Sequence, residues 1–254
     1  MKEIVDIESK IWSILNRSES FYAHHFIKNL NRRSYIKRYI KVKRLDWDLT
    51  IKDCGRIILD DGCGNMIDAI YLGLHGFKVV AMDSSTTLIK AGLQLVNEEG
   101  LSDIIYPVVG DATQLPFKTE AFDTVVSYSC IDHVKGRTKQ RLWIKEMSRA
   151  TVKGGKIVLT TTNTLNPLIA LLARTITILV EGYYETSLTP MFVKKELRKN
   201  NIRLIEFKSN TFFYPGYLGF TKLGYVLDWL LSYLEHIPQL KYFGGRMGFK
   251  GIKE

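Results

Sequence analysis

The stretch IILDDGCGNM, Ile57–Met66, decides the fold class of this 254-residue chain. An apolar run that ends in acids and a glycine turn predicts a buried strand leading into a helix. Gly62 and Gly64 allow positive φ and close backbone approach, which favours an anionic or nucleotide-like ligand at this turn. Met66 stands where turns of this kind carry a third glycine. Its side chain either packs beneath the following helix, because methionine adapts to irregular gaps, or narrows the ligand site.

Strands and helices alternate from residue 56 to residue 163, which predicts a mostly parallel sheet with helices on both faces. The expected strands are 56–60, 77–83, 104–111, 121–130 and 154–163, and the expected helices are 68–76, 86–100 and 141–151. Beyond Asn163 the alternation weakens. There we expect a helix from Pro190 with Thr189 as its N-cap, strands over 202–208 and 244–252, and an apolar helix over 219–235.

The composition is that of a globular protein. Hydrophobic residues make up 46% of the chain, enough for a sizeable core. The cysteines, Cys54, Cys63 and Cys130, are too widely spaced to form a metal cluster or a disulfide framework. No apolar segment of a secretory signal follows Met1, so a cytoplasmic location is the simplest interpretation.

The net charge of +10 gathers at the two ends of the chain. Residues 1–50 carry 11 Lys/Arg against 6 Asp/Glu, residues 51–165 carry 13 against 13, and residues 166–254 carry 12 against 7. Residues 1–44 read as helical, and the stretch from Lys28 to Arg44 holds eight basic residues and no acidic one. This predicts a helix on the core with a solvated basic face. Basic flanks suit nucleic acid, anionic lipid or an acidic small substrate, or serve solubility alone.

Acidic residues at the strand ends distinguish between two ligands of such sheets. Asp60 lies two residues before Gly62, where its carboxylate would repel the pyrophosphate of a dinucleotide and attract an ammonium or sulfonium group. Asp83 ends the next strand, 19 residues after Gly64, where it can accept hydrogen bonds from ribose hydroxyls. These acids favour S-adenosylmethionine over NAD.

Five ordered motifs between residues 54 and 163 resemble those of the class I S-adenosylmethionine-dependent methyltransferases, especially their small-molecule branch. They are ILDDGCGNM (58–66), VVAMDSS (79–85), VVGDATQLPF (108–117), FDTVVSYSCIDHV (122–134) and EMSRATVKGGKIVL (146–159). The resemblance implies a Rossmann-like doubly wound sheet, mostly parallel with an antiparallel last strand. It also implies methyltransferase activity with S-adenosyl-L-methionine as the cofactor.

The resemblance further implies a set of cofactor-binding residues at the strand ends. Asp60 and the glycine turn would hold the amino acid portion, Asp83 the ribose and Asp111 the adenine amino group, with Ser127 near the methionine. The full set is Asp60, Gly62, Cys63, Gly64, Asp83, Ser84, Asp111, Ala112 and Ser127. Taken singly, each acid is more often a turn or cap residue on a solvated strand end.

Met66 departs from the family pattern, in which a third glycine keeps the first helical turn slim beside the cofactor. Because the other motifs are intact, we expect the Met66 side chain to pack away from the cofactor. Met66→Gly is then expected to cost stability, through lost packing and helix propensity, without improving cofactor affinity.

A general base assists methyl transfer to a hydroxyl or an acidic carbon. His133 is the candidate, because it matches a position that the family often fills with histidine on the acceptor side. Tyr128 and Asp132 are neighbouring substrate-side alternatives. His133 could instead have only a structural role, as a capping or packing residue. The sequence lacks both the Asn/Asp-Pro-Pro-aromatic signature of nucleic-acid amino methylation and a His/Asp/Glu cluster for a metal.

The acceptor is expected to bind outside the cofactor-binding core, residues 54–163. We divide the chain into a helical, basic N-terminal segment, 1–50, and a methyltransferase domain, 51–254, with cap elements at about 164–190 and 210–235. An apolar, aromatic cap favours a small, hydrophobic or lipid-like acceptor, with peripheral membrane contact. The alternatives are an RNA methyltransferase that uses the basic N-terminal face and a non-catalytic protein that binds S-adenosylmethionine.

Overall fold

The computed structural model describes residues 2–17, 32–166, 188–210 and 242–254, together with the isolated positions 230, 233, 237 and 240. Most of the predicted cap, including the apolar helix expected over 219–235, lies outside these residues. Within the described part of the chain, no helix is both long and apolar enough to cross a membrane.

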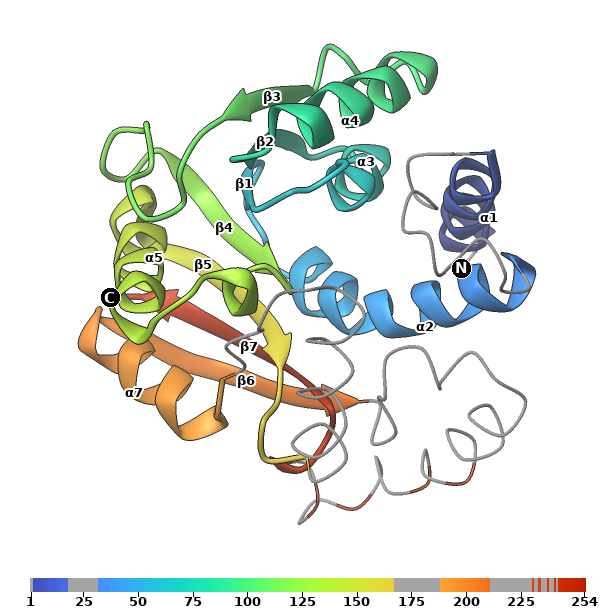
Figure 1. The fold of residues 1–254 in the computed structure, drawn as a ribbon. Coiled ribbons are helices and arrows are strands. Elements are labelled where there is room, and N and C mark those ends of the chain that lie inside the picture. Colours follow the sequence, from blue (N-terminus) through green and yellow to red (C-terminus); the bar gives the residue numbers. More distant parts are fainter. Residues whose placement is uncertain are drawn as a thin grey trace.

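Seven strands form one sheet with the order β3-β2-β1-β4-β5-β7-β6 (Figure 1). The strands from β1 to β5 pair in parallel, whereas β7 runs antiparallel to both of its neighbours. Their bounds are β1 Ile57–Asp61, β2 Lys78–Asp83, β3 Ile105–Val109, β4 Phe122–Tyr128, β5 Thr151–Thr162, β6 Ile202–Asn210 and β7 Arg246–Lys253. The predicted Rossmann-like sheet with an antiparallel last strand is confirmed. The strand order reverses between β1 and β4, so a ligand crevice is expected at their carboxyl ends.

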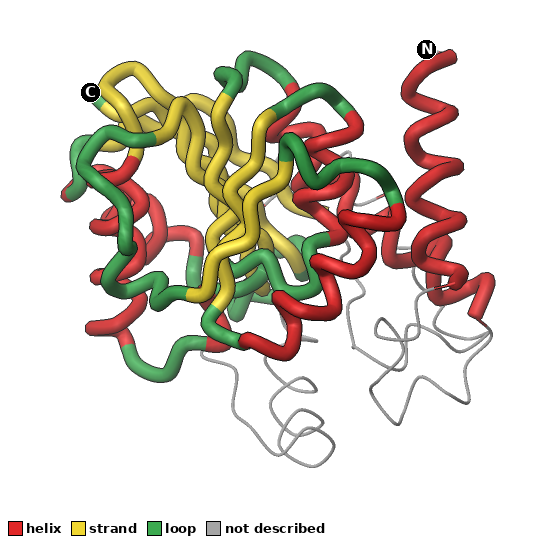
Figure 2. Tube along the Cα trace, turned by 90° about the horizontal axis from the view of Figure 1, so that it is seen from above, coloured by secondary structure: helices red, strands yellow, loops and turns green. Residues whose placement is uncertain are grey.

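Helices cover both faces of the sheet, which gives the domain three layers (Figures 1 and 2). The helices α1 to α4 lie on one side and α5 and α7 on the other. Their bounds are α1 Lys2–Arg17, α2 Arg32–Ile51, α3 Ile67–Leu74, α4 Thr86–Glu98, α5 Arg137–Ala150 and α7 Pro190–Lys199. Because successive strand residues face opposite sides, Ile58 of β1 joins the apolar cluster beneath α1–α4 and Leu59 joins the cluster beneath α5 and α7.

Side-chain caps determine where two of these helices begin. The Ser85 side chain accepts a hydrogen bond from the backbone N–H of Leu88 at the start of α4. Thr189 accepts the equivalent bond from Phe192 at the start of α7. The predicted N-cap Thr189, with Pro190 in the first turn, is therefore confirmed.

The helix α2 packs closely on the rest of the domain. Leu49 lies against Gly248 of β7, where an added Cβ would come within 2.5 Å of the leucine Cδ1. Trp47 stacks on Tyr71 of α3 with their ring centroids 3.8 Å apart. Lys43 is buried as well, so the prediction of a solvated basic face is wrong at this position. A charge at that depth requires acidic partners.

Candidate cofactor site

The glycine turn after β1 is hydrogen-bonded to β2 at Gly62 and Cys63 and borders open space at Gly64. The backbone N–H groups of Gly62 and Cys63 both donate to the Met82 carbonyl, at 2.8 and 2.9 Å. Gly62 and Gly64 have φ angles of 86° and 53°, which disfavour side chains. A Cβ on Gly62 would come within 2.4 Å of the Cys130 Sγ, whereas one on Gly64 would meet no atom within 4 Å. Gly64 therefore borders open space that a ligand can occupy.

The Asp83 carboxylate is held in place by this turn. Its Oδ2 accepts a hydrogen bond of 2.9 Å from the backbone N–H of Gly64, and its Oδ1 accepts one of 2.8 Å from Ser85. An ionised carboxylate offers about four acceptor positions, so two remain for ligand hydroxyls. The neighbouring Ser84 is exposed. Asp83 thus keeps acceptor positions that a ligand can use, and its role in ribose binding stays a prediction.

Asp111 follows β3 at the same edge of the sheet. Its Oδ1 accepts hydrogen bonds from the backbone N–H and the hydroxyl of Thr113, at 2.8 and 2.7 Å. These bonds hold the pKa of Asp111 below its ordinary value, so this exposed carboxyl is ionised at neutral pH. Ala112 beside it is half-buried. The predicted adenine-side residues therefore stand where a ligand can reach them.

Asp60 lies deep at the end of β1 with an unsatisfied oxygen. The side chain is 1% exposed, and its Oδ2 has no hydrogen-bond partner among the described residues. Burial raises the pKa of Asp60 well above its ordinary value, and the nearby Asp68 raises it further, while Lys43 opposes the shift. A buried carboxyl without a partner is costly, and a ligand cation at this position would remove that cost.

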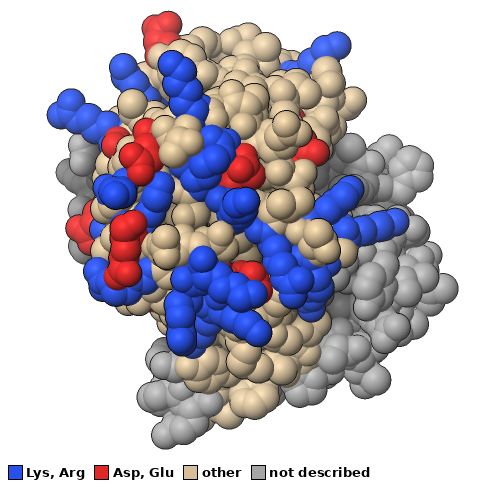
Figure 3. All heavy atoms as spheres, turned by 90° about the vertical axis from the view of Figure 1, so that its left-hand side faces the viewer, with Lys and Arg blue, Asp and Glu red and all other residues tan. Residues whose placement is uncertain are grey.

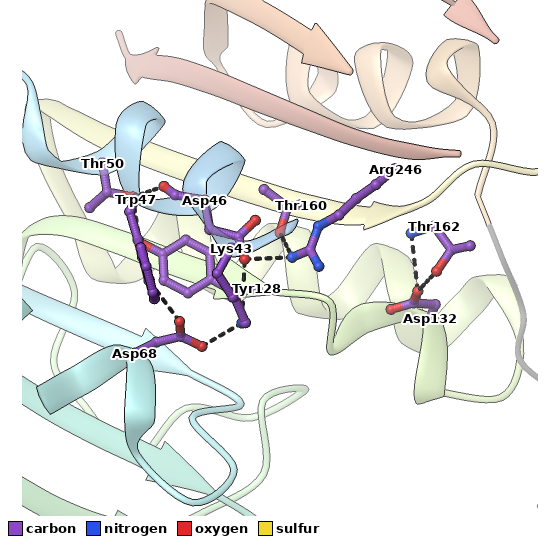
Figure 4. Close-up of polar contacts among 10 residues, drawn as sticks. All are labelled: Lys43, Asp46, Trp47, Thr50, Asp68, Tyr128, Asp132, Thr160, Thr162 and Arg246. Carbon is purple, nitrogen blue, oxygen red and sulfur yellow. Dashed lines mark hydrogen bonds and ion pairs between the residues drawn. The ribbon is translucent and has the colours of Figure 1, made fainter. Parts of the chain in front are cut away.

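A network of buried charges connects the helix α2 with α3 and β7 (Figure 4). Asp60 interacts electrostatically with two of its members, Asp68 and Lys43. The Lys43 Nζ lies 2.5 Å from the Asp68 Oδ2 and 3.3 Å from the Asp46 Oδ2. Arg246 of β7 donates to the same Asp46 carboxylate. These residues come from α2, α3 and β7, so the network joins three elements that lie far apart in the sequence.

The charges in this network do not balance. Lys43 and Arg246 supply two cations, whereas Asp46, Asp68 and Asp60 supply three carboxyls. Burial alone would lower the pKa of Lys43, but Asp68, Tyr39 and Asp46 together raise it above its ordinary value. One carboxyl therefore lacks a counter-charge. Asp46 and Asp60 each have one oxygen without a hydrogen-bond partner among the described residues, but only Asp60 also forms no ion pair with a described residue. The ammonium group of an amino acid ligand would supply the missing cation.

The substrate-side candidates of the sequence differ in their surroundings. Tyr128 is buried, and its hydroxyl shares a hydrogen bond with Thr50 of α2. The Asp132 Oδ2 accepts bonds from the backbone N–H and hydroxyl of Thr162, at 3.1 and 2.6 Å (Figure 4). His133, which ends the short helix η3 (Ile131–His133), is exposed. Of the three, His133 alone has an exposed side chain.

Ser127 is fully buried on β4, and its hydroxyl has no hydrogen-bond partner among the described residues. Sequence reasoning did not select the residues of the buried charge network, which are Lys43, Asp46, Trp47, Asp68 and Arg246. The Trp47 Nε1 donates to the Asp68 Oδ1 at 2.9 Å and so completes the contacts of that carboxylate. One local signal was available, because Lys43, Asp46 and Trp47 share one face of a helix at i, i+3 and i+4.

Met66, which stands where the family carries a third glycine, has its side chain inside the protein. It is the N-cap of α3, with φ 63° and ψ 18°, and its side chain is fully buried. The Met66 Cγ lies against Gly92 of α4, where an added Cβ would be only 2.7 Å away. The side chain thus packs in the interior against α4. The predicted helix-propensity cost of Met66→Gly is wrong, since this left-handed backbone favours glycine.

The central part of the chain matches a known family. Residues 59–159 match the model of the methyltransferase domain. Two curated relatives are norajmaline N-methyltransferase from Rauvolfia serpentina, 31% identical over 103 residues, and demethylmenaquinone methyltransferase from Mycobacterium sp. (strain KMS), 34% identical over 108 residues. The matched segments cover 40% and 41% of this chain, and 34% and 40% of those relatives.

The fold extends beyond the matched segment. Geranyl diphosphate C-methyltransferase from Streptomyces coelicolor A3(2), solved with S-adenosyl-L-homocysteine, superposes with a TM-score of 0.64 over 98% of both chains, at 13% identity. Residues 59–159 therefore match a methyltransferase domain, and the sheet around them has the fold of solved S-adenosylmethionine-dependent methyltransferases. The cofactor of this family is S-adenosylmethionine, and the open glycine turn, the two strand-end acids and the unsatisfied Asp60 fit it. The predictions of family and cofactor are confirmed.

Proposed function

We propose that this protein methylates a small, hydrophobic molecule. The observation that carries the methyl-donor part of the proposal is the buried Asp60 with its unsatisfied oxygen, beside a turn that is open at Gly64. An amino acid ammonium satisfies such a carboxyl, whereas the pyrophosphate of NAD would be repelled by it. The size of the acceptor is supported by the relatives, which are named for methylating norajmaline and demethylmenaquinone.

The residues of the site would divide the work of holding the cofactor. Asp60 would bind the ammonium group, Asp83 the ribose hydroxyls and Asp111 the adenine amino group. When bound, S-adenosylmethionine supplies a methyl group already activated by its sulfonium. The protein therefore needs mainly to align the acceptor with that methyl group and to exclude water.

His133 remains our candidate for the general base. Its exposed position just after β4 gives an acceptor access to the imidazole. Tyr128 serves less well, because burial raises the pKa of its hydroxyl far above neutral and Thr50 already binds it. His133→Ala should lower the rate of transfer to a hydroxyl or carbon acceptor by about a hundredfold or more, with cofactor affinity unchanged. His133→Asn is the control for side-chain size, because asparagine fills similar space without supplying a general base.

The experiment uses S-adenosylmethionine with a tritium-labelled methyl group. The protein is incubated with an extract of small metabolites and, separately, with total RNA. Label that moves into the organic-solvent fraction, and is lost in Asp60→Asn, supports the proposal. Label that precipitates with RNA supports the alternative in which the basic N-terminal segment binds RNA. Binding of S-adenosylmethionine by calorimetry without transfer to either fraction would indicate the non-catalytic alternative.

A further inference from the structure

Two neighbouring helices, α5 and α7, each carry a marked excess of positive charge. The helix α5 carries five Lys/Arg and one Glu, and the helix α7 carries four Lys/Arg and one Glu. Their combined charge is +7 (nine cations less two acids). Figure 3 shows the Lys and Arg side chains collected on the side of the molecule that α5 and α7 form in Figure 1.

The two acids of these helices already form ion pairs. The Glu146 Oε2 lies 2.7 Å from the Arg149 Nη2. The Oε1 of the buried Glu196 lies 3.2 Å from the Lys199 Nζ and 3.5 Å from the Arg141 Nε. The remaining exposed cations of the two helices form no ion pair with any described residue. They are Lys139, Lys145, Lys195 and Arg198. Their charge is therefore available to an anionic partner.

Two large apolar side chains stand exposed among these cations. Leu142 is 42% exposed and lies three residues from both Lys139 and Lys145 on α5. Met191 is 57% exposed at the start of α7, four residues before Lys195. Residues three or four apart share one side of a helix, so each apolar side chain sits beside lysines. We call this set, Lys139, Leu142, Lys145, Met191, Lys195 and Arg198, the α5–α7 face.

We propose that the α5–α7 face docks on an anionic phospholipid bilayer. Lysine and arginine near such a surface attract the phosphate and carboxylate head groups, and exposed apolar side chains enter the boundary with the acyl chains. RNA is the less suitable partner, because single-stranded nucleic acid is held mainly by stacking on exposed aromatic rings. The described residues of α5 and α7 expose no such ring, since Trp143 is buried and Phe192 is half-covered, with the Arg137 guanidinium 4.5 Å from its ring centroid.

The α5–α7 face begins at the edge of the sheet that carries the cofactor site. The helix α5 starts at Arg137, shortly after β4 ends, and α7 starts beside Leu188, which bridges to Asn163 at the end of β5. The side chain of Lys139 is near enough to Asp111 to affect it electrostatically. Docking would therefore bring the edge of the site close to the bilayer. That a hydrophobic acceptor passes from the bilayer to the site rests on the proposed function. Docking itself does not depend on that function.

The test measures sedimentation of the whole protein with phosphatidylcholine vesicles that contain or lack phosphatidylserine. We expect binding to the phosphatidylserine vesicles alone, weakening as salt is added. Replacing Lys139, Lys145, Lys195 and Arg198 together by serine should lower the partition coefficient by roughly a hundredfold or more. Replacing Leu142 and Met191 by serine should lower it by about tenfold while leaving RNA binding unchanged.

The matched control removes four cations outside the face, by serine replacements at Lys52, Arg56, Lys78 and Lys90, which are all exposed. This variant has the same net charge as the first and should keep vesicle binding within about twofold of the wild type. Equal losses in both variants, absence of binding by the wild type at low salt, or loss of RNA binding without vesicle binding would each overturn the proposal. The assay needs neither cofactor nor turnover, so a protein without methyltransferase activity could still pass it.

Discussion

Gly92 of α4 provides the space that Met66 occupies. A Cβ at Gly92 would lie 2.7 Å from the Met66 Cγ and 2.9 Å from the backbone carbonyl carbon of Asn65. Gly92 therefore lets α4 approach the glycine turn closely and lets a methionine stand where the family carries glycine. The two residues form one packing unit, 26 positions apart in the sequence.

Gly92→Ala should destabilise the protein by about 1–3 kcal/mol, because overpacking outweighs the gain in helix propensity. In the Met66→Gly background the same change should cost less, because the Cγ contact has gone. Denaturant unfolding of the single and double variants measures this coupling. Gly73→Ala is the matched control, since the nearest atom to its added Cβ would be the flexible end of Ile105, at 3.0 Å. Equal destabilisation by Gly92→Ala in the wild type and in Met66→Gly would show that the two residues are not coupled.

Met66→Gly alone combines two opposing effects. It removes a fully buried side chain, which costs about 2–5 kcal/mol, and it relieves a left-handed backbone conformation, which returns about 1–3 kcal/mol. We expect a net destabilisation and unchanged affinity for S-adenosylmethionine, measured by unfolding and calorimetry. Much tighter cofactor binding by the glycine variant would show instead that the methionine obstructs the site.

Asp60→Asn should stabilise the free protein at neutral pH and destroy its cofactor affinity. Because the folded state raises the pKa of Asp60, it binds more protons than the unfolded state at pH values above the ordinary 3.8. The contribution of Asp60 to stability is therefore lost as the pH rises through the raised value. The variant should lose this pH dependence. Unfolding curves at several pH values test the predicted stability, and calorimetry tests the predicted loss of cofactor affinity. A variant that is no more stable at neutral pH, or that still binds S-adenosylmethionine, would contradict the corresponding prediction.

The acids of the candidate cofactor site could be selected from the sequence because each one follows its own strand. A strand end, a turn and an acid are adjacent in the chain, so Asp60, Asp83 and Asp111 stand out locally. The partners of the buried network do not, since Arg246 and Asp46 meet across 200 positions. Lys43 was hidden within a basic run, because charge alone does not say which side of a helix is buried.

The charge of α5 was missed for a different reason. Residues 51–165 sum to zero because they hold 13 acids, the strand-end acids among them, and 13 cations, of which α5 carries five. In space the two groups separate, with the strand-end acids at the cofactor site and the lysines of α5 on the outer surface of the domain. A count over single helices, taken after the alternation of elements had been recognised, would have located the α5–α7 face.

Lys43→Met should destabilise the protein by about 3–5 kcal/mol, because it leaves Asp46 and Asp68 buried without their shared cation. Adding Asp68→Asn should recover part of the loss by removing one of the stranded charges. Lys52→Met, an exposed lysine just beyond α2, is the control and should change little. Denaturant unfolding of these variants decides the matter. A double variant less stable than Lys43→Met would contradict the charge balance that assigns Asp60 to the ligand.

Asp83 offers the sharpest test of the cofactor's ribose site, because both of its oxygens already accept a backbone N–H, from Gly64 and from Ser85. In Asp83→Asn the amide NH₂ would face one of these donors, so the turn loses a bond and the ribose loses an acceptor. We expect the affinity for S-adenosylmethionine to fall by about 1–3 kcal/mol, and NAD to bind neither wild type nor variant. Calorimetry with both ligands measures this. Asp103→Asn, at an acid outside the site, is the control. Unchanged affinity in Asp83→Asn would remove this carboxylate from the ribose site, and binding of NAD by the wild type would reverse the choice of ligand made from Asp60.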